Sequence, residues 1–151
     1  MKKKNTLGVK LYINTGDRDP KYITEETGIQ YIKIREKGKP WIEYGTGEIN
    51  MHRKCKENNW IYEIELRTKD EDGVYLSQPL IEMVKFLNHN EIKLQRIFAD
   101  PENAVFLVVY GTIYDFHIYF QLLPELLNDL AKFKIPVEFD IYSLIKTDDD
   151  N

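Results

Sequence analysis

The sequence predicts an α+β fold, a single domain in which helices pack on one face of a mostly antiparallel sheet. Six segments alternate apolar and polar residues as strands do, and three segments carry the apolar stripe of a helix. Several strands are joined by connections of hairpin length, which favours antiparallel pairing. The expected order is β-α-β-β-α-β-β-α-β, with one domain covering residues 1–151.

The size and composition are those of an ordinary globular domain. The chain has 151 residues, of which 42% are hydrophobic and 30% are charged. No apolar run reaches the roughly 18 residues that a membrane span needs, so we expect no membrane association. The basic and then apolar N-terminus alternates like a strand, and we expect no export signal. The single cysteine, Cys55, cannot form an internal disulfide, which favours a cytoplasmic location.

The first part of the chain predicts two strands around a short helix. The first strand covers about Leu7–Asn14, with its aliphatic residues on one face. Asp19 can cap a helix that runs to about Thr27, where Gly28 can adopt the left-handed conformation that ends a helix. The second strand follows at about Tyr31–Glu36.

A long loop at residues 41–59 separates these elements from the next strand. Its sequence is polar and contains two nearby glycines, and long loops in compact domains are often functional. The strand pattern returns at Trp60–Thr68, and a helix begins at Ser77. Residues Asn88–Asn90 break this helix before a further helical stretch. The apolar stripe of the helix consists of Leu80, Met83, Val84 and Leu87.

The C-terminal part predicts a strand, a second strand, a helix and a last strand. These elements cover Ala104–Thr112, Phe116–Gln121, Leu122–Phe133 and Pro136–Ser143, and we expect the acidic tail, residues 147–151, to fray. The side chains expected to face the core are Leu123, Leu126, Leu127, Leu130 and Phe133 on the helix, and Val137, Phe139 and Ile141 on the last strand.

Charge is unevenly distributed along the chain. The net charge is −4, yet residues 33–56 carry seven Lys and Arg against three acids, while residues 100–151 carry three against ten. Domains that bind nucleic acid are usually basic overall, so we expect no nucleic-acid partner. The asymmetry fits a polar protein interface or a self-complementary homodimer.

The sequence contains no recognisable catalytic, cofactor or metal site. His52 and Cys55 form half of a zinc motif, but no second pair at metal spacing exists. Glu63 and Glu65 lie two apart on one strand face, a separation of roughly 7 Å that paired acid–base carboxylates use. Acids that alternate on the outer face of a strand are more often solvated, so we predict no enzyme.

A face rich in tyrosine and acid is the most informative feature. Tyr12, Tyr119 and Tyr142 all fall opposite the inward aliphatic residues, with Glu138 and Asp140 beside Tyr142 and with Phe106, Val108 and Tyr110 as further candidates. Tyrosine is enriched at protein interfaces because it combines contact area with a hydrogen-bonding tip. These residues therefore form a candidate protein-interaction site, unless the 41–59 loop covers them.

Several motifs occur together in a recognisable order. Residues 9–29 read VKLYINTGDRDPKYITEETGI, the Lys37–Gly38 pair and the Trp60 strand follow, and residues 136–142 read PVEFDIY. This arrangement resembles the bacterial domain of unknown function family 4279, over roughly Val9 to Tyr142. The resemblance implies a single α+β domain and no particular activity. Some small bacterial domains of this kind resemble immunity partners of secreted toxins.

Our leading hypothesis is a cytosolic protein-binding module, in particular an immunity-type inhibitor whose acidic surface occludes a basic toxin domain. Such a protein needs surface complementarity and no catalytic group or cofactor. The first alternative is a small-molecule-binding domain, or an unfamiliar enzyme, with a pocket between the long loop and the sheet. The second alternative is a homodimeric structural protein joined through the tyrosine face.

Overall fold

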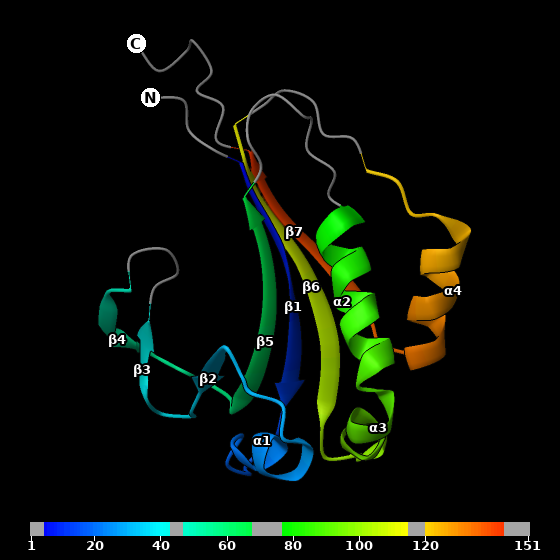
Figure 1. The fold of residues 1–151 in the computed structure, drawn as a ribbon. Helices are drawn as coiled ribbons and strands as arrows, with labels where there is room; N and C mark the ends of the chain where they lie inside the picture. Colours follow the sequence, from blue (N-terminus) through cyan, green and yellow to red (C-terminus); the bar gives the residue numbers. More distant parts are fainter. Residues whose placement is uncertain (1–4, 43–46, 68–76, 115–119, 144–151) are drawn as a thin grey trace, which may run out of the picture. The chain divides into compact units, whose positions relative to one another are not determined.

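The computed structural model describes residues 5–42, 47–67, 77–114 and 120–143 (Figure 1). Helices contain 32% of the residues and strands contain 38%, which confirms the predicted α+β class. In chain order, the described elements are β1 (Thr6–Asn14), α1 (Tyr22–Thr27), β2 (Lys33–Arg35), β3 (Pro40–Ile42), β4 (Ile49–Lys54), β5 (Asn59–Arg67), α2 (Ser77–His89), α3 (Glu91–Ala99), β6 (Ala104–Ile113), α4 (Pro124–Phe133) and β7 (Val137–Ser143).

The main sheet has five strands in the order β2-β5-β1-β6-β7 and is mixed but mostly antiparallel. β2 pairs antiparallel with β5, with Ile34 opposite Trp60. β6 and β7 pair in parallel, beginning with Leu107 opposite Val137. A parallel pair needs a crossover connection, and α4 lies within it. β3 and β4 form a separate two-stranded antiparallel sheet.

The chain forms two compact units that interleave along the sequence. The first unit contains Met1–Leu11, Glu63–Asn90 and Phe106–Asn151, and the second contains Tyr12–Tyr62 and Glu91–Val105. Three strands of the main sheet, β1, β5 and β6, therefore contribute residues to both units.

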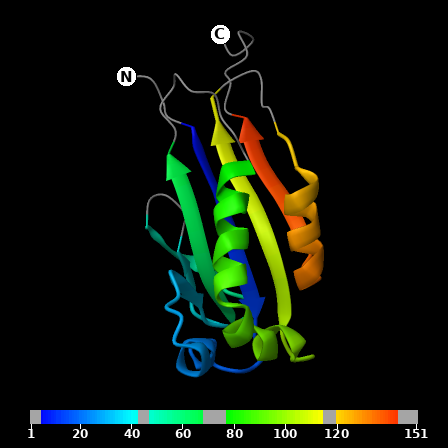
Figure 2. The ribbon, with the colours of Figure 1, turned by 45° about the vertical axis from the view of Figure 1, so that its right-hand side comes forward.

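In the first unit, α2 and α4 lie on the same side of the strands (Figures 1 and 2) and contact each other. All four residues of the predicted α2 stripe are buried, which confirms that prediction. The buried side of α4 is narrower and consists of Leu126 and Leu130. The strand side of this core is formed by Leu7, Val9, Leu11, Leu107, Val109 and Ile113.

In the second unit, the short helix α1 ends as the sequence predicts. Gly28 has a φ of 70°, and its N–H donates to the Thr24 carbonyl at 2.8 Å. This left-handed conformation costs glycine little because it has no Cβ. The core of the unit includes Ile23 and the fully buried Trp60, whose indole Nε1 donates to Thr24 Oγ1 at 3.0 Å. The indole thus keeps a hydrogen bond inside an apolar core.

The segment 41–59 is not one long loop, as the sequence pattern suggests. It contains the end of β3 and all of β4, while residues 43–46 lie outside the described residues. The pattern conceals the hairpin because β4 buries neither face: Ile49 and Met51 are 62% and 68% exposed. Without a buried side, nothing selects an alternation of apolar and polar residues.

The order of elements also differs from the predicted one. β3 and β4 are additional strands, and the second predicted helix is two helices, α2 and α3, which confirms the break near Asn90. Gln121, at the end of the predicted strand Phe116–Gln121, belongs to no strand, and residues 115–119 lie outside the described residues. The tail at residues 147–151, which we expect to fray, also lies outside them.

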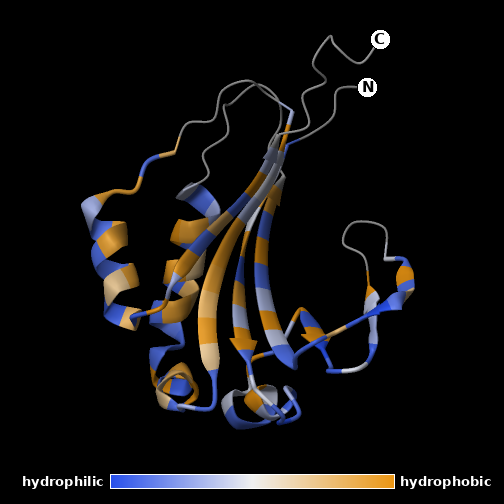
Figure 3. Ribbon diagram, turned by 180° about the vertical axis from the view of Figure 1, so that it is seen from behind, coloured by the Kyte–Doolittle hydropathy of each residue, from blue (hydrophilic) through white to orange (hydrophobic). Residues whose placement is uncertain are grey.

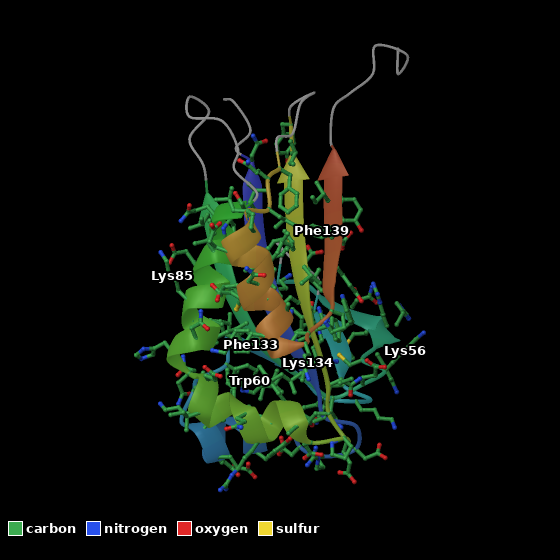
Figure 4. The ribbon with its side chains drawn as sticks, turned by 90° about the vertical axis from the view of Figure 1, so that its right-hand side faces the viewer. Lys56, Trp60, Lys85, Phe133, Lys134 and Phe139 are labelled. Atoms are coloured by element: carbon green, nitrogen blue, oxygen red, sulfur yellow. The ribbon has the colours of Figure 1, made fainter. Side chains whose placement is uncertain are left out.

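The predicted burial of Leu127 and Phe139 is wrong. Leu127 is 47% exposed and Phe139, labelled in Figure 4, is 48% exposed, although the Phe139 ring packs edge-on against Phe120 with 5.1 Å between centroids. Periodicity identifies the side of a helix that faces a sheet, but it does not say how far the packed area extends. On α4 that area reaches only Leu126 and Leu130.

Two helical leucines provide a matched test of this burial pattern. Leu87→Ala removes a fully buried side chain from α2 and should destabilise the fold by about 2–5 kcal/mol. Leu127→Ala, on the half-exposed side of α4, should cost about 1 kcal/mol or less. Urea denaturation followed by circular dichroism measures both. Equal losses of stability would contradict the observed core.

Candidate interaction surface

The register of β6 and β7 places acidic and aromatic residues on one face of the sheet. Glu138 pairs with Val108, Asp140 with Tyr110, and Tyr142 with Thr112. Paired residues in a sheet point to the same side, and alternate residues point to opposite sides. This face is therefore opposite the buried residues of β6, such as Val109. Figure 3 shows the alternation of hydrophilic and hydrophobic residues along the strands from behind.

Tyr110 links this part of the face to β5. Its hydroxyl donates to Glu63 Oε1 at 2.5 Å and lies 3.2 Å from Glu65 Oε2. A phenol has one proton, so the shorter contact takes the hydrogen bond and the Glu65 contact is the weaker of the two. The two glutamates that the sequence places on one strand face thus meet at a single tyrosine.

Lys10 of β1 completes the cluster. Its Nζ lies 3.5 Å from Glu63 Oε1 and 4.0 Å from the centroid of the Tyr110 ring. The lysine is only 6% exposed, and the Glu63 side chain is 19% exposed. A buried ammonium needs such partners, because removing one of them leaves an uncompensated charge. The salt bridge and the cation–π contact therefore fix Lys10 beside Tyr110.

Gly8, also on β1, makes room for the tyrosine. A Cβ built at Gly8 would overlap the phenol end of Tyr110, so the Tyr110 ring lies directly across the glycine backbone. Glycine inside a strand often marks such a close approach. We call the surface formed by Lys10, Glu63, Glu65, Tyr110, Glu138, Asp140 and Tyr142 the acidic sheet face.

The two tyrosines of this face have raised pKa values. Burial, and then the hydrogen bond to Glu63, raise the pKa of Tyr110 far above its ordinary value. Its hydroxyl therefore stays protonated at neutral pH and acts as a donor, not as a base or a nucleophile. A hydrogen bond to Asp140 also raises the pKa of Tyr142. Both tyrosines thus present neutral hydroxyls to neighbouring carboxyl groups.

The structure brings three of the five predicted interaction residues together. Glu138 and Asp140 are exposed, and Tyr142 is 60% exposed on the same side of β7, so no described segment covers them. Tyr12 belongs to the second unit and is half-buried, with the Arg35 guanidinium 5.7 Å from its ring. Tyr119 lies outside the described residues.

Sequence reasoning missed the cluster around Tyr110. Alternation places Glu63, Glu65, Lys10 and Tyr110 on outward faces of their strands, but it does not say that β1 lies between β5 and β6. The signal that could have found it is Gly8, a glycine within an otherwise strong strand, because such a residue indicates a close neighbour.

Other candidate chemistry remains unsupported within the described ranges. Among these residues, no group of three or more His, Cys, Asp and Glu side chains is placed to hold a metal ion. His52 is exposed on β4, while Cys55 is buried with its Sγ 3.9 Å from the Pro40 carbonyl oxygen. None of the described helices has both the length and the apolar character needed to cross a membrane.

A family model described as Domain of unknown function (DUF4279) matches residues 5–144. The chain belongs to the DUF4279 family. The match spans β1 to β7, so it includes every residue of the acidic sheet face. No curated protein and no solved structure matches this DUF4279 chain. The site must therefore be interpreted from its own geometry.

Stability at high pH should report on Tyr110. Because its pKa is higher in the folded chain than in the unfolded chain, its contribution to stability is complete below about pH 10 and is lost as the pH rises above that value. The parent should therefore lose stability more steeply than Tyr110→Phe between about pH 9.5 and 11. Urea denaturation across this range measures the difference, and parallel curves would contradict the assigned environment.

Gly8→Ala should be costly only while Tyr110 is present. The added methyl group overlaps the ring, and overpacking of this kind destabilises proteins by about 1–3 kcal/mol. In a Tyr110→Ala background the same change should be neutral or slightly stabilising, because alanine suits a strand better than glycine. Chemical denaturation of the four chains of this double-mutant cycle gives the coupling. Additive effects would show that the two residues do not touch.

Proposed function

We propose that this DUF4279 chain is a cytosolic protein-binding module, an immunity-type inhibitor whose acidic sheet face occludes a basic surface of a toxin. The observation that carries the proposal is the exposed array of Glu138, Asp140 and Tyr142 on β7. An inhibitor that acts by occlusion needs such a surface and no reacting group.

The composition of the acidic sheet face supports a basic protein partner. Four carboxylates lie on it, and its only ammonium, Lys10, is buried and already paired with Glu63. Charge of one sign accelerates the encounter with an oppositely charged protein. Tyr142 adds a large, partly apolar side chain beside Asp140, and tyrosine is among the residue types that most often dominate binding energy.

The cluster around Tyr110, on β5, β1 and β6, supports the same interpretation. Tyr110 is held by Glu63, Lys10 and the approach to Gly8, so the middle of the face has little freedom to rearrange. A surface that is rigid before binding loses less entropy in the complex. The network therefore holds the face in one arrangement before a partner binds.

Binding kinetics should separate charge from contact on this face. Tyr142→Ala should raise koff by roughly tenfold or more, as expected when a large aromatic contact is removed from an interface. Glu138→Lys and Asp140→Lys should instead lower kon and weaken its dependence on salt. The measurement is surface-binding kinetics at two salt concentrations against the partner that co-purifies with the parent chain.

Two matched variants serve as controls. Glu25→Lys on α1 makes the same change in net charge, and Tyr31→Ala removes another exposed tyrosine. Both should bind like the parent. If they weaken binding as much as the β7 variants do, the acidic sheet face is not the interface. If the parent forms a stable dimer that Tyr142→Ala dissociates, the face joins two copies of this chain instead.

A further inference from the structure

A second, oppositely charged site lies in the second unit, beside β2 and the β3–β4 hairpin. It is a pocket of about 310 Å³. We call it the basic pocket, because the residues that line it include Arg35, Trp41, Arg53, Lys54, Lys56 and Glu57. Among the described residues, four cations and one carboxylate line this pocket, in a chain whose net charge is −4. Such a local reversal of charge needs a physical explanation.

Two of these cations contact the ring of Trp41. The guanidinium carbons of Arg35 and Arg53 lie 4.0 and 4.1 Å from its ring. The two positive groups are therefore at most about 8 Å apart, a distance at which like charges repel. Stacking on an aromatic ring orients a guanidinium while its N–H groups remain able to bind an anion. The ring thus holds two fork-shaped donors at one place.

The backbone around the pocket is held by strand pairing and by backbone hydrogen bonds. Arg35 lies opposite Asn59 in the β2–β5 pair, and Lys54 lies opposite Pro40 in the β3–β4 pair. Two further hydrogen bonds of 2.9 Å close the ladder, from Gly38 N–H to the Cys55 carbonyl and from Cys55 N–H to the Lys39 carbonyl. Arg35, Arg53 and Lys54 are therefore presented from paired strands, and Lys56 lies two residues beyond the end of β4.

The pocket does not neutralise itself. In the part of the chain that the structure describes, no carboxylate forms an ion pair with Arg53, Lys54 or Lys56. Elsewhere in the same unit, Arg18 lies 2.8 Å from Asp100 and Lys37 lies 3.1 Å from Asp17. The unit therefore pairs some of its cations with acids, whereas these three, including Lys56 (labelled in Figure 4), have no acidic partner among the described residues.

We propose that the basic pocket binds a small phosphorylated compound with two or more negative charges. Guanidinium groups match phosphate oxygens in a two-pronged geometry, and the lysines add point charges. The volume suits a small molecule. A nucleic-acid strand fits less well, because the chain is acidic and Trp41 already stacks with guanidinium groups instead of offering its ring to a base.

The two tryptophans allow a direct test with the full chain. Pyrophosphate is titrated into ¹⁵N-labelled protein at constant ionic strength, and the two indole N–H signals are followed by NMR. The Trp41 signal should shift and saturate, while the signal of Trp60, which is fully buried in the core, should stay in place. Absence of a saturable Trp41 shift up to about 10 mM pyrophosphate would overturn the proposal.

Variants distinguish a built site from general charge attraction. Arg53→Gln should weaken pyrophosphate binding by roughly tenfold or more, since it removes charge-assisted hydrogen bonds. Arg96→Gln removes another exposed arginine, on α3, and should have less than about a twofold effect. Lys56→Gln lies outside the strands and should weaken binding without disturbing the hairpin.

Three outcomes would contradict the assignment. If Arg53→Gln and Arg96→Gln weaken pyrophosphate binding equally, the interaction depends only on the net charge of the chain and not on the basic pocket. Unchanged binding in both Arg53→Gln and Lys56→Gln would place pyrophosphate elsewhere on the chain. A single-stranded oligonucleotide that shifts the Trp41 signal at a lower concentration than pyrophosphate would assign the pocket to nucleic acid.

Discussion

The acidic sheet face depends on one hydrogen bond, from the Tyr110 hydroxyl to Glu63. This bond fixes the phenol across Gly8, and the fixed ring in turn gives Lys10 an aromatic surface and an anionic partner in the same place. Without it, the ring beside the Lys10 ammonium would no longer be held in place, and Glu63 would lose its closest donor. A polar network in the middle of a sheet is stable only when its members satisfy one another, and here each of the three groups depends on the other two.

The two units carry opposite charge at their most distinctive places. The acidic sheet face gathers carboxylates around neutral tyrosine hydroxyls, whereas the basic pocket gathers guanidinium and ammonium groups around an indole. Both use aromatic rings to position charge, and in both the aromatic residue is held by contacts with its neighbours. Four of the seven cations in residues 33–56 line the basic pocket, whereas only two of the ten acids in residues 100–151, Glu138 and Asp140, belong to the acidic sheet face.

The sequence predicts the parts of this structure that bury a continuous side. The stripe of α2, the end of α1 at Gly28 and the outward placement of Glu138, Asp140 and Tyr142 all follow from periodicity and local backbone preference. The β3–β4 hairpin does not, because strands that are solvated on both faces leave no pattern. Nor does the Tyr110 cluster, which depends on the order of β5, β1 and β6 and on residues more than 40 positions apart. For Leu127 the pattern predicts too much: the residue is apolar and lies on the predicted side of its helix, yet it is exposed because the packed area does not reach it.

The position of β7 at the end of the sheet order gives its acids a second role. A terminal strand offers backbone N–H and C=O groups to any chain that can align with it, which is how sheets join into fibres. If two copies met edge to edge along β7, Glu138 and Asp140 of one copy would face the same carboxylates of the other across a strand spacing of about 5 Å. Their repulsion opposes this self-association. The charge that the proposed function uses to attract a basic protein would therefore also oppose the pairing of β7 with a second copy of the chain.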